Sequence, residues 1–211
     1  TQVGTAAALT VGKDWVVPYY RDIGVAIALG MTPNELMLNV LAKADDPNSG
    51  GRQMPMHWGH KKLGIFSMGS SVATTIPRAA GVALASKLRK QNAVTIVYFG
   101  EGAASEGDFH EGLSFAGVHR LPVVFFCNNN GWATSVPVNL QNAERQVAKK
   151  AKGYGFPGVT VDGLDPLTVY DAVKQAIVRA RSGKGPTLVE ANTIRMMPHS
   201  SSDDHLRYRT P

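Results

Sequence analysis

The sequence predicts an α/β protein with a doubly wound, mostly parallel sheet, formed as a single domain over residues 1–211. Three observations predict this class: apolar runs that do not alternate with polar residues, helical spacing between two such runs, and glycines directly after the first run. Strands that are buried on both faces of a parallel sheet read as continuous apolar segments. Hydrophobic residues make up 44% of the chain, which is enough for such a core.

The two clearest strands are expected at residues 93–99 and 121–127, which are rich in Val, Ile and Phe. Between them, residues 106–119 carry apolar side chains at helical spacing, so we expect a right-handed strand–helix–strand unit. The same reasoning predicts further elements: strands at 159–161 and 187–194, and helices at 33–43, 72–90 and 166–181.

Two segments are expected to be loops. Residues 44–71 hold many Gly, Pro, Met and Ser, which is typical of a long ordered loop with a function. Residues 196–211 are polar and aperiodic, and they form either a mobile loop or a loop that a ligand orders. The helix before the first of these loops should begin at Thr32, an N-cap residue, with Pro33 in the first helical position.

Composition narrows the possible partners. The net charge of +6 permits nucleic-acid binding, but the basic residues are scattered, and an anionic cofactor or an acidic partner explains the charge equally well. No apolar run reaches about 18 residues, the length of a membrane span. Cys127, the only cysteine, lies in an apolar run, which indicates a buried thiol in a reducing compartment. We therefore expect neither nucleic acid nor a membrane as a partner.

The segment that follows the first strand points to a ligand site. Residues 100–107 open on Gly100-Glu101-Gly102, and glycines between a buried strand and a helix let a phosphate approach the backbone. The dinucleotide-binding fingerprint does not fit, because Ser105 stands at the third glycine position and residues 112–143 contain no Asp or Glu. A bare Glu101 carboxylate would also repel a diphosphate.

A divalent cation would reverse this repulsion. The second strand ends in Asn128-Asn129-Asn130, and amide oxygens there lie beside Glu101 if the two strands are neighbours. Mg²⁺ prefers oxygen ligands and commonly joins one or two protein oxygens to substrate phosphates. Alternatively, the asparagine run is only a turn, since Asn tolerates left-handed backbone.

Together, Gly100-Glu101-Gly102 and the downstream Asn129-Asn130 resemble the thiamine diphosphate motif. Residues 98–108 and 125–133 closely resemble the alpha subunit of the decarboxylating component of 2-oxo acid dehydrogenase complexes, and residues 51–57 resemble its branched-chain type. The resemblance covers residues 1–211 and implies a thiamine diphosphate-binding fold. Chains of this family are longer at both ends, which implies that this one is truncated.

The resemblance also implies a set of site residues. Glu101 and Asn130 match side-chain ligands of Mg²⁺, and Trp132 matches a residue that offers its backbone carbonyl. His199 and Ser70 match active-site residues, of which His199 assists reductive acylation of a lipoyl group. The matched cofactor-binding residues are Tyr20, Arg21, Ser70, Val72, Gly102, Ala103, Asn128 and His199.

Several of these matches carry a further implication. Asn128 stands where branched-chain relatives usually have an Arg that reaches the diphosphate, which lowers the positive charge of the site. Ser200 matches a phosphorylation site of animal relatives, and Arg195, Asp203 and Tyr208 would support the loop around His199. A potassium site of some relatives corresponds to Gly69, Ser71, Thr74 and Thr75, but side chains seen there are replaced, and we do not predict it.

The implied function is oxidative decarboxylation of branched-chain 2-oxo acids with reductive acylation of a lipoyl group. The chain would be the alpha half of an α2β2 enzyme, inactive without its beta subunit, and would work with a lipoyl-bearing acyltransferase. The implied location is the cytoplasm of a bacterium or archaeon, or the mitochondrial matrix. The alternatives are pyruvate or another 2-oxo acid as substrate, a transketolase-like enzyme, a Rossmann-type nicotinamide dehydrogenase, and a catalytically dead binding module.

His57 and His60 share helical spacing but lack an evident third metal ligand, so they are expected to be structural or solvated.

Overall fold

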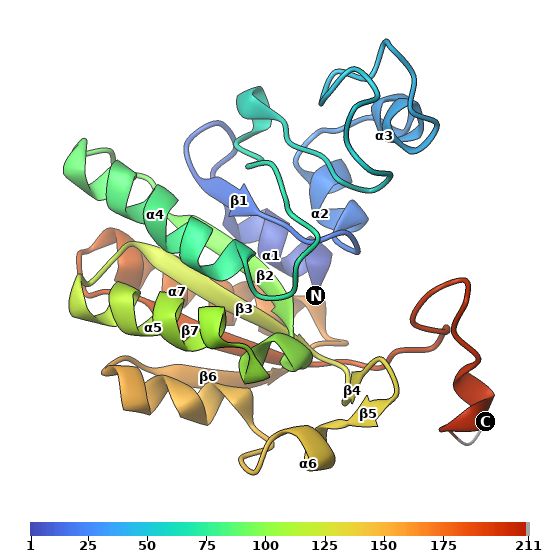
Figure 1. Ribbon diagram of the computed structural model, residues 1–211. Coiled ribbons are helices and arrows are strands. Elements are labelled where there is room, and N and C mark those ends of the chain that lie inside the picture. The colour runs from blue at the N-terminus through green and yellow to red at the C-terminus, as the bar shows by residue number, and fades with distance from the viewer. Residues whose placement is uncertain (210–211) are drawn as a thin grey trace.

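The computed structural model describes residues 1–209 and contains one five-stranded sheet (Figure 1). The strand order is β1-β2-β3-β7-β6, and every neighbouring pair is parallel. The expected mostly parallel α/β class is therefore confirmed. The strands are β1 (Trp15–Val17), β2 (Thr95–Gly100), β3 (Val123–Asn129), β6 (Gly158–Asp162) and β7 (Thr187–Asn192).

Helices cover both faces of this sheet, as a doubly wound fold requires (Figure 1). On one face, α4 (Thr75–Leu88) and α5 (Gly107–Val118) pack against side chains such as Phe99 and Cys127. On the other face, Tyr98 and Phe126 meet three helices: α1 (Gln2–Ala8), α2 (Ile23–Ala28) and α7 (Pro166–Arg181). Because successive side chains of a strand point to opposite faces, β2 and β3 must be apolar at nearly every position.

Cys127 confirms this two-sided burial. Its side chain is fully buried, and it is a free thiol. Burial raises the pKa of the Cys127 thiol well above its ordinary value. The thiol is therefore a packing group, as expected.

The predicted helices and strands are all present, with shifted ends. The helix predicted at 72–90 begins at Thr75, and α3 (Pro33–Val40) ends before the predicted Lys43. Thr32 and Glu35 form a reciprocal capping box at the start of α3. The sequence reasoning missed α1, α2 and β1, which are too short to show a clear period. The position of β1 is set by a contact with a distant element. The buried carboxylate of Asp14, just before β1, accepts hydrogen bonds from Nη2 of Arg181 in α7 at 2.8 and 2.9 Å.

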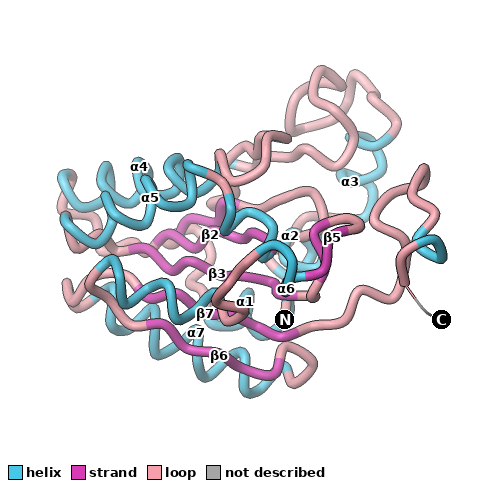
Figure 2. Tube along the Cα trace, turned by 60° about the horizontal axis from the view of Figure 1, so that its bottom comes forward, coloured by secondary structure: helices cyan, strands magenta, loops and turns pink. Residues whose placement is uncertain are grey.

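The remaining elements are small. They are the hairpin strands β4 (Trp132–Ala133) and β5 (Val136–Pro137), α6 (Val138–Gln141), and four 3-10 segments: Lys61–Leu63, Glu101–Ser105, Val147–Tyr154 and His205–Arg207. The loops on either side of α3 and the tail after β7 extend from the same side of the molecule (Figure 2). Thr210 and Pro211 of the predicted tail lie outside the described residues. Within residues 1–209, no helix has the length and hydropathy that crossing a bilayer requires.

Candidate functional site

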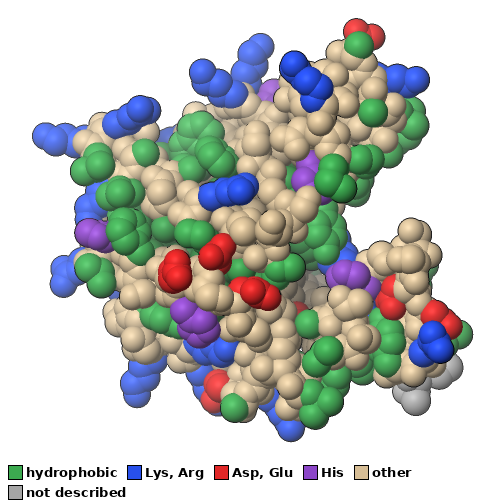
Figure 3. All heavy atoms as spheres, in the orientation of Figure 1, with side chains coloured by type: hydrophobic (Ala, Val, Ile, Leu, Met, Phe, Trp, Pro, Cys, Tyr) green, Lys and Arg blue, Asp and Glu red, His purple; other side chains and the backbone are tan. Residues whose placement is uncertain are grey.

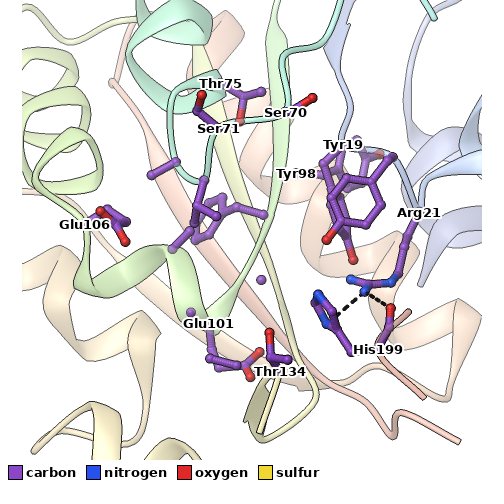
Figure 4. A pocket seen from close by; sticks show the side chains of 18 of the residues that line it. Tyr19, Arg21, Ser70, Ser71, Thr75, Tyr98, Glu101, Glu106, Thr134 and His199 are labelled. Carbon is purple, nitrogen blue, oxygen red and sulfur yellow. Dashed lines mark hydrogen bonds between the residues drawn. The ribbon is translucent and has the colours of Figure 1, made fainter. Parts of the chain in front are cut away.

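A cavity of about 290 Å³ lies at the carboxyl ends of β2 and β3. Its lining comes from five parts of the chain that are far apart in sequence (Figure 4). They are the segment after β1, the loop before α4 with its first residue, the end of β2 with the following 3-10 segment, the turn and hairpin after β3 with α6, and the tail. In Figure 3 the surface is hollowed between the main body and the C-terminal segment. Every residue of the predicted site except Asn128 lines the cavity: Tyr20, Arg21, Ser70, Val72, Glu101, Gly102, Ala103, Asn130, Trp132 and His199.

Glu101 is the buried carboxylate of the site. It directly follows β2, and only 1% of the residue is exposed. Its Oε2 accepts a hydrogen bond from the backbone N–H of Asn130 at 3.1 Å, whereas its Oε1 is buried without a hydrogen-bond partner. Burial raises the pKa of the Glu101 carboxyl, against the lowering effect of backbone N–H donors. A cation beside the unpartnered Oε1 would favour the ionised form of Glu101, as the charge of Arg195 already does.

The asparagine run at the end of β3 forms a turn and also lines the cavity. The Asn130 Oδ1 accepts from the Trp132 N–H at 3.1 Å, and the Asn129 Oδ1 accepts from the Gly131 N–H at 3.0 Å. Gly131 has φ of 80°, a conformation that glycine adopts without strain. This turn carries Asn130 and Trp132 to the cavity beside Glu101. The two interpretations of the run, turn and ligand site, are thus compatible.

The oxygen groups around Glu101 fit a magnesium ion that is shared with a phosphate. Among residues 1–209 no group of three or more His, Cys, Asp or Glu side chains could hold a metal ion. Mg²⁺ does not need such a cage, because it commonly takes one or two protein carboxylates and completes its shell with phosphate oxygens and water. The unpartnered Oε1 of Glu101 supplies the carboxylate oxygen, and the amide of Asn130 supplies a second oxygen nearby.

Backbone groups of the 3-10 segment Glu101–Ser105 form the floor of the cavity. Gly102 and Ala103 both line it, and the carbonyl of Gly102 accepts from the Gln141 Nε2 at 3.0 Å. A Cβ at position 102 would lie 3.0 Å from the Cβ of Ala133, so glycine allows the segment to pack closely on the hairpin. Gly102 therefore brings this backbone close to Ala133 and Gln141, which line the same cavity.

Arg21 provides positive charge at the other side of the cavity. Its Nη2 donates to the carbonyl oxygen of His199 at 2.8 Å and to the His199 Nδ1 at 3.0 Å (Figure 4). The guanidinium carbon also lies 4.8 Å from the ring centroid of Tyr20, within the range of a cation–π contact. The planar guanidinium is suited to bidentate recognition of phosphate.

His199 is held as a neutral imidazole. Arg21 can only donate, so Nδ1 of His199 must accept and the ring proton must reside on Nε2. Burial lowers the pKa of His199, and the charges of Arg21 and Arg195 lower it further, against the raising effect of Asp203. His199 therefore offers an Nε2–H group for hydrogen bonding.

The tail around His199 is fastened by its own side chains. The Asp203 Oδ2 accepts from the His199 N–H at 2.7 Å and from the Tyr208 hydroxyl at 2.6 Å. These bonds keep the pKa of Asp203 below its ordinary value. Arg195 donates to the same hydroxyl at 2.8 Å, and the Tyr208 ring packs on Trp132. The three residues predicted to support the loop therefore contact one another, and Ser200 is exposed beside them.

The loop before α4 forms the upper rim of the cavity in Figure 4. Ser70 lines it and forms a hydrogen bond with Nε2 of His57, while Val72 is 61% exposed at the mouth. Three of the residues that match a potassium site in some relatives also line the cavity: Gly69, Ser71 and Thr75.

Asn128 does not line the cavity. It lies within β3 next to Gly100 of β2, and it shares a face of the strand with Phe126, toward α1 and α7. Its Oδ1 is buried without a hydrogen-bond partner. The cofactor role that the resemblance implied for this position is not visible in the geometry of the short Asn side chain.

Sequence reasoning missed several lining residues, among them Tyr19, Tyr98, Glu106 and Gln141. Tyr98 reads as an ordinary core residue of β2, and its buried hydroxyl has no hydrogen-bond partner. Gln141 arrives through the β4–β5 hairpin, which no pattern predicted. Tyr19, adjacent to Tyr20 and Arg21, and Glu106, within the glycine-rich segment 100–107, carried signals that could have identified them.

Comparison with protein families gives a match to the Dehydrogenase E1 component over residues 1–211. A relative from Bacillus subtilis, named 2-oxoisovalerate dehydrogenase subunit alpha, is 55% identical over 208 residues, which are 99% of this chain and 63% of the relative. The mitochondrial 2-oxoisovalerate dehydrogenase subunit alpha of mouse is 43% identical over 100% of this chain and 47% of its own length. The chain thus spans less than two thirds of these relatives.

Solved structures share the fold at much lower identity. Transketolase from Leishmania mexicana superposes with a TM-score of 0.59 at 21% identity, over 92% of this chain and 30% of that chain. A thiamin diphosphate-dependent enzyme from Mycobacterium smegmatis gives a TM-score of 0.59 at 19% identity, over 92% and 31%. This likeness confirms the expected fold, the one found in thiamine diphosphate enzymes.

Proposed function

Because the chain belongs to the Dehydrogenase E1 component family, we propose that it is the alpha part of a thiamine diphosphate enzyme that oxidatively decarboxylates branched-chain 2-oxo acids. The observation that carries this proposal is the cavity itself. A buried carboxylate with an unpartnered oxygen, Glu101, lies on one side, and a phosphate-binding guanidinium, Arg21, lies on the other. This is the charge pattern that a magnesium diphosphate group requires.

The metal and the diphosphate of the cofactor each have a matching part of the chain. Glu101, Asn130 and the carbonyl of Trp132 would hold Mg²⁺, and Arg21 with the backbone of Gly102 and Ala103 would hold the diphosphate. Thiamine diphosphate, when bound, supplies the electron sink for loss of CO₂. Glu101 would hold the ion at the carboxyl ends of β2 and β3, where its burial limits the access of water.

His199 supplies the proton-handling group of this chain. Its Nε2–H can donate a hydrogen bond to an oxygen of the substrate, because Arg21 occupies Nδ1. The pKa lowered by burial keeps the ring neutral at pH 7, so it does not add a second positive charge beside Arg21. We propose that this group orients the acyl portion for transfer to a lipoyl group.

A beta subunit is proposed to complete the site as an α2β2 assembly, with a lipoyl-bearing acyltransferase as the next partner. Val72, which is 61% exposed at the mouth of the cavity, and Met54, which is 63% exposed next to Ser70, are apolar side chains that a partner would cover. The relatives are named as alpha subunits. The predicted location, bacterial cytoplasm or mitochondrial matrix, agrees with relatives of both kinds and stays a prediction, as does the single-domain assignment.

The branched-chain substrate is supported by the names of the relatives, 2-oxoisovalerate dehydrogenase. Pyruvate or another 2-oxo acid is the alternative within the same chemistry. A nicotinamide dehydrogenase is disfavoured by the family match and by Glu101, which a diphosphate would meet without a compensating cation.

The test is turnover of a branched-chain 2-oxo acid against pyruvate by the full-length protein, copurified with its beta subunit, in the presence of Mg²⁺ and thiamine diphosphate. Faster decarboxylation of the branched substrate supports the proposal. Preference for pyruvate would retain the mechanism and change the substrate. A protein that binds neither the cofactor nor Mg²⁺ and turns over neither acid would be a binding module.

A further inference from the structure

His57 is a buried residue that contacts Ser70 of the cavity lining, and the proposed mechanism has not used this contact. The residue is 8% exposed and lies in the loop between α3 and α4. Its Nδ1 is 3.0 Å from the carbonyl oxygen of Pro55, and its Nε2 is hydrogen-bonded to the hydroxyl of Ser70. The sequence alone predicted only a structural or solvated histidine here.

The contact with Pro55 fixes the tautomer of the ring. A carbonyl oxygen can only accept, so Nδ1 of His57 must carry a proton. In the neutral imidazole Nε2 is then an acceptor, and the Ser70 hydroxyl must donate to it. The other polar contact of Ser70, the sulfur of Met54 at 3.8 Å, is a much weaker acceptor and does not compete.

The backbone that carries His57 is fixed by α3. Asn39 is fully buried; its Nδ2 donates to the carbonyl of His57 at 3.3 Å, and its Oδ1 accepts from the Met56 N–H at 3.0 Å. The same Nδ2 lies 3.4 Å from the carboxylate of Asp46, which also accepts from Ser49. A buried network therefore holds the imidazole at a set position relative to Ser70.

We propose that His57 is a positioning residue that keeps Ser70 as a hydrogen-bond acceptor toward the cavity, an inference that rests on the proposed function. With its proton committed to His57, Ser70 can accept from an N–H or O–H of a bound ligand but cannot donate to one. The ionised carboxylate of a 2-oxo acid has no donor, so Ser70 contributes nothing to its binding. Ser70 can instead accept a hydrogen bond from an oxygen of the substrate once that oxygen has gained a proton during the reaction. Because this bond is absent when the substrate first binds, it raises kcat rather than lowering KM.

Two substitutions of His57 separate this role from packing. H57Q can place its amide oxygen near the position of Nε2 and still accept from Ser70. H57N retains a donor near the position of Nδ1 for Pro55 and loses the group that faces Ser70. H60N is the matched control, because His60 contacts Glu35 and the Leu63 N–H and does not line the cavity.

The variants are measured in the full-length assembly with its beta subunit, together with S70A and the double variant H57N/S70A. H57N is expected to lower kcat about tenfold, the effect of one lost hydrogen bond of about 1.4 kcal/mol, with a much smaller change in KM. H57Q should recover most of the lost turnover, and H60N should match the wild type. The double variant should be no slower than S70A, because His57 acts through Ser70.

Three results would overturn the inference: wild-type kcat in H57N, full additivity in the double variant, or equal losses of kcat and thermal stability in H57Q and H57N. ¹⁵N spectra of the histidine-labelled assembly test the tautomer without turnover. They should show Nε2 of His57 unprotonated in the wild type, and a protonated Nε2 would also overturn it. If the wild-type assembly turns over no 2-oxo acid, the proposed function fails, while the spectra still decide how His57 is held.

Discussion

The two sides of the cavity are built in different ways. One side consists of the strand ends of β2 and β3, where Glu101 and Asn130 are fixed by parallel pairing and a tight turn. The other side consists of segments that leave the sheet, where Arg21 and His199 hold each other through hydrogen bonds. These are the sheet side and the loop side of the cavity.

The two sides of the cavity are preorganised to different degrees. On the sheet side, a ligand meets groups whose positions follow from the core, so little ordering is needed on binding. On the loop side, Nη2 of Arg21 is already engaged by His199, and a diphosphate would use the remaining N–H groups of the guanidinium or compete for Nη2. The sheet side should therefore dominate metal affinity, and the loop side should tune cofactor affinity.

Each side also contains a buried carboxyl group, and the loop-side group gives the largest expected effect. Asp22 accepts from the Tyr19 N–H at 2.8 Å beneath the segment that carries Arg21. Burial raises the pKa of Asp22 to about 8, from 3.8. The folded protein therefore holds a proton between pH 4 and 8 that the unfolded chain releases. The proton on Asp22 therefore makes its full contribution to the free energy of unfolding below pH 4, and this contribution is lost as the pH rises to about 8.

The variant D22N removes this titration while keeping an acceptor for Tyr19. The free energy of unfolding of the wild type should fall relative to that of D22N by several kcal/mol between pH 4 and 8, and then stay level. Urea unfolding at a series of pH values measures the difference. Parallel curves over this range would show that Asp22 is ionised in the folded protein.

On the sheet side, E101Q is expected to weaken Mg²⁺-dependent binding of thiamine diphosphate by about 100-fold or more, since even indirect partners of a metal ligand contribute 10–100-fold. The amide cannot neutralise the cation. Quenching of tryptophan fluorescence, to which Trp132 of the cavity lining contributes, gives the affinity when it is titrated with cofactor at several Mg²⁺ concentrations. E106Q is the control: Glu106 lines the same cavity but is exposed, and its effect should be at least tenfold smaller. Equal losses would argue against a metal at Glu101.

The contrast between the sides also explains how far the sequence could predict the molecule. The ends of β2 and β3 were predictable because continuous apolar runs locate buried strands, and polar residues after neighbouring parallel strands must meet. Glu101 and the asparagine run 128–130 follow from that argument, whereas the choice of Asn130 within the run came from the resemblance. The pattern gave no comparable information on β1 or the β4–β5 hairpin, which are too short to be periodic and depend on contacts such as Asp14 with Arg181.

The loop side was accessible only through resemblance. Nothing in the spacing of Arg21, Ser70 and His199 brings them together, because loop-to-loop distances are set by the whole fold. His57 shows the same limit, since its partner Ser70 is defined by a network through Asn39. For Asn128 the resemblance was misleading. The strand pattern placed the residue correctly at the end of β3, but its side chain lies on a face of the strand that is away from the cavity.

The loop side can be tested by keeping the charge of Arg21 and removing its planar shape. R21K should weaken cofactor binding about tenfold, because lysine cannot make two parallel hydrogen bonds to a phosphate. If the metal is held by the sheet side, R21K should not change the affinity for Mg²⁺ measured in the absence of cofactor. Calorimetric titration of both ligands checks this. A parallel loss of Mg²⁺ affinity would mean that the two sides are not independent.

The smallest effect is expected at Asp203, which holds the tail around His199 in place but does not line the cavity. D203N keeps one acceptor oxygen for the His199 N–H and the Tyr208 hydroxyl, but it removes the negative charge that strengthens both bonds. Cofactor affinity should fall about threefold, as for an exposed charged contact. Protease cleavage within residues 196–209 should become faster without cofactor and return toward the wild-type rate with it. D204N is the matched control, since the Asp204 side chain does not cap the following turn. If D203N and D204N behave alike, the tail is held by Arg21 and His199 rather than by its own hydrogen bonds, and the loop side reduces to that single contact.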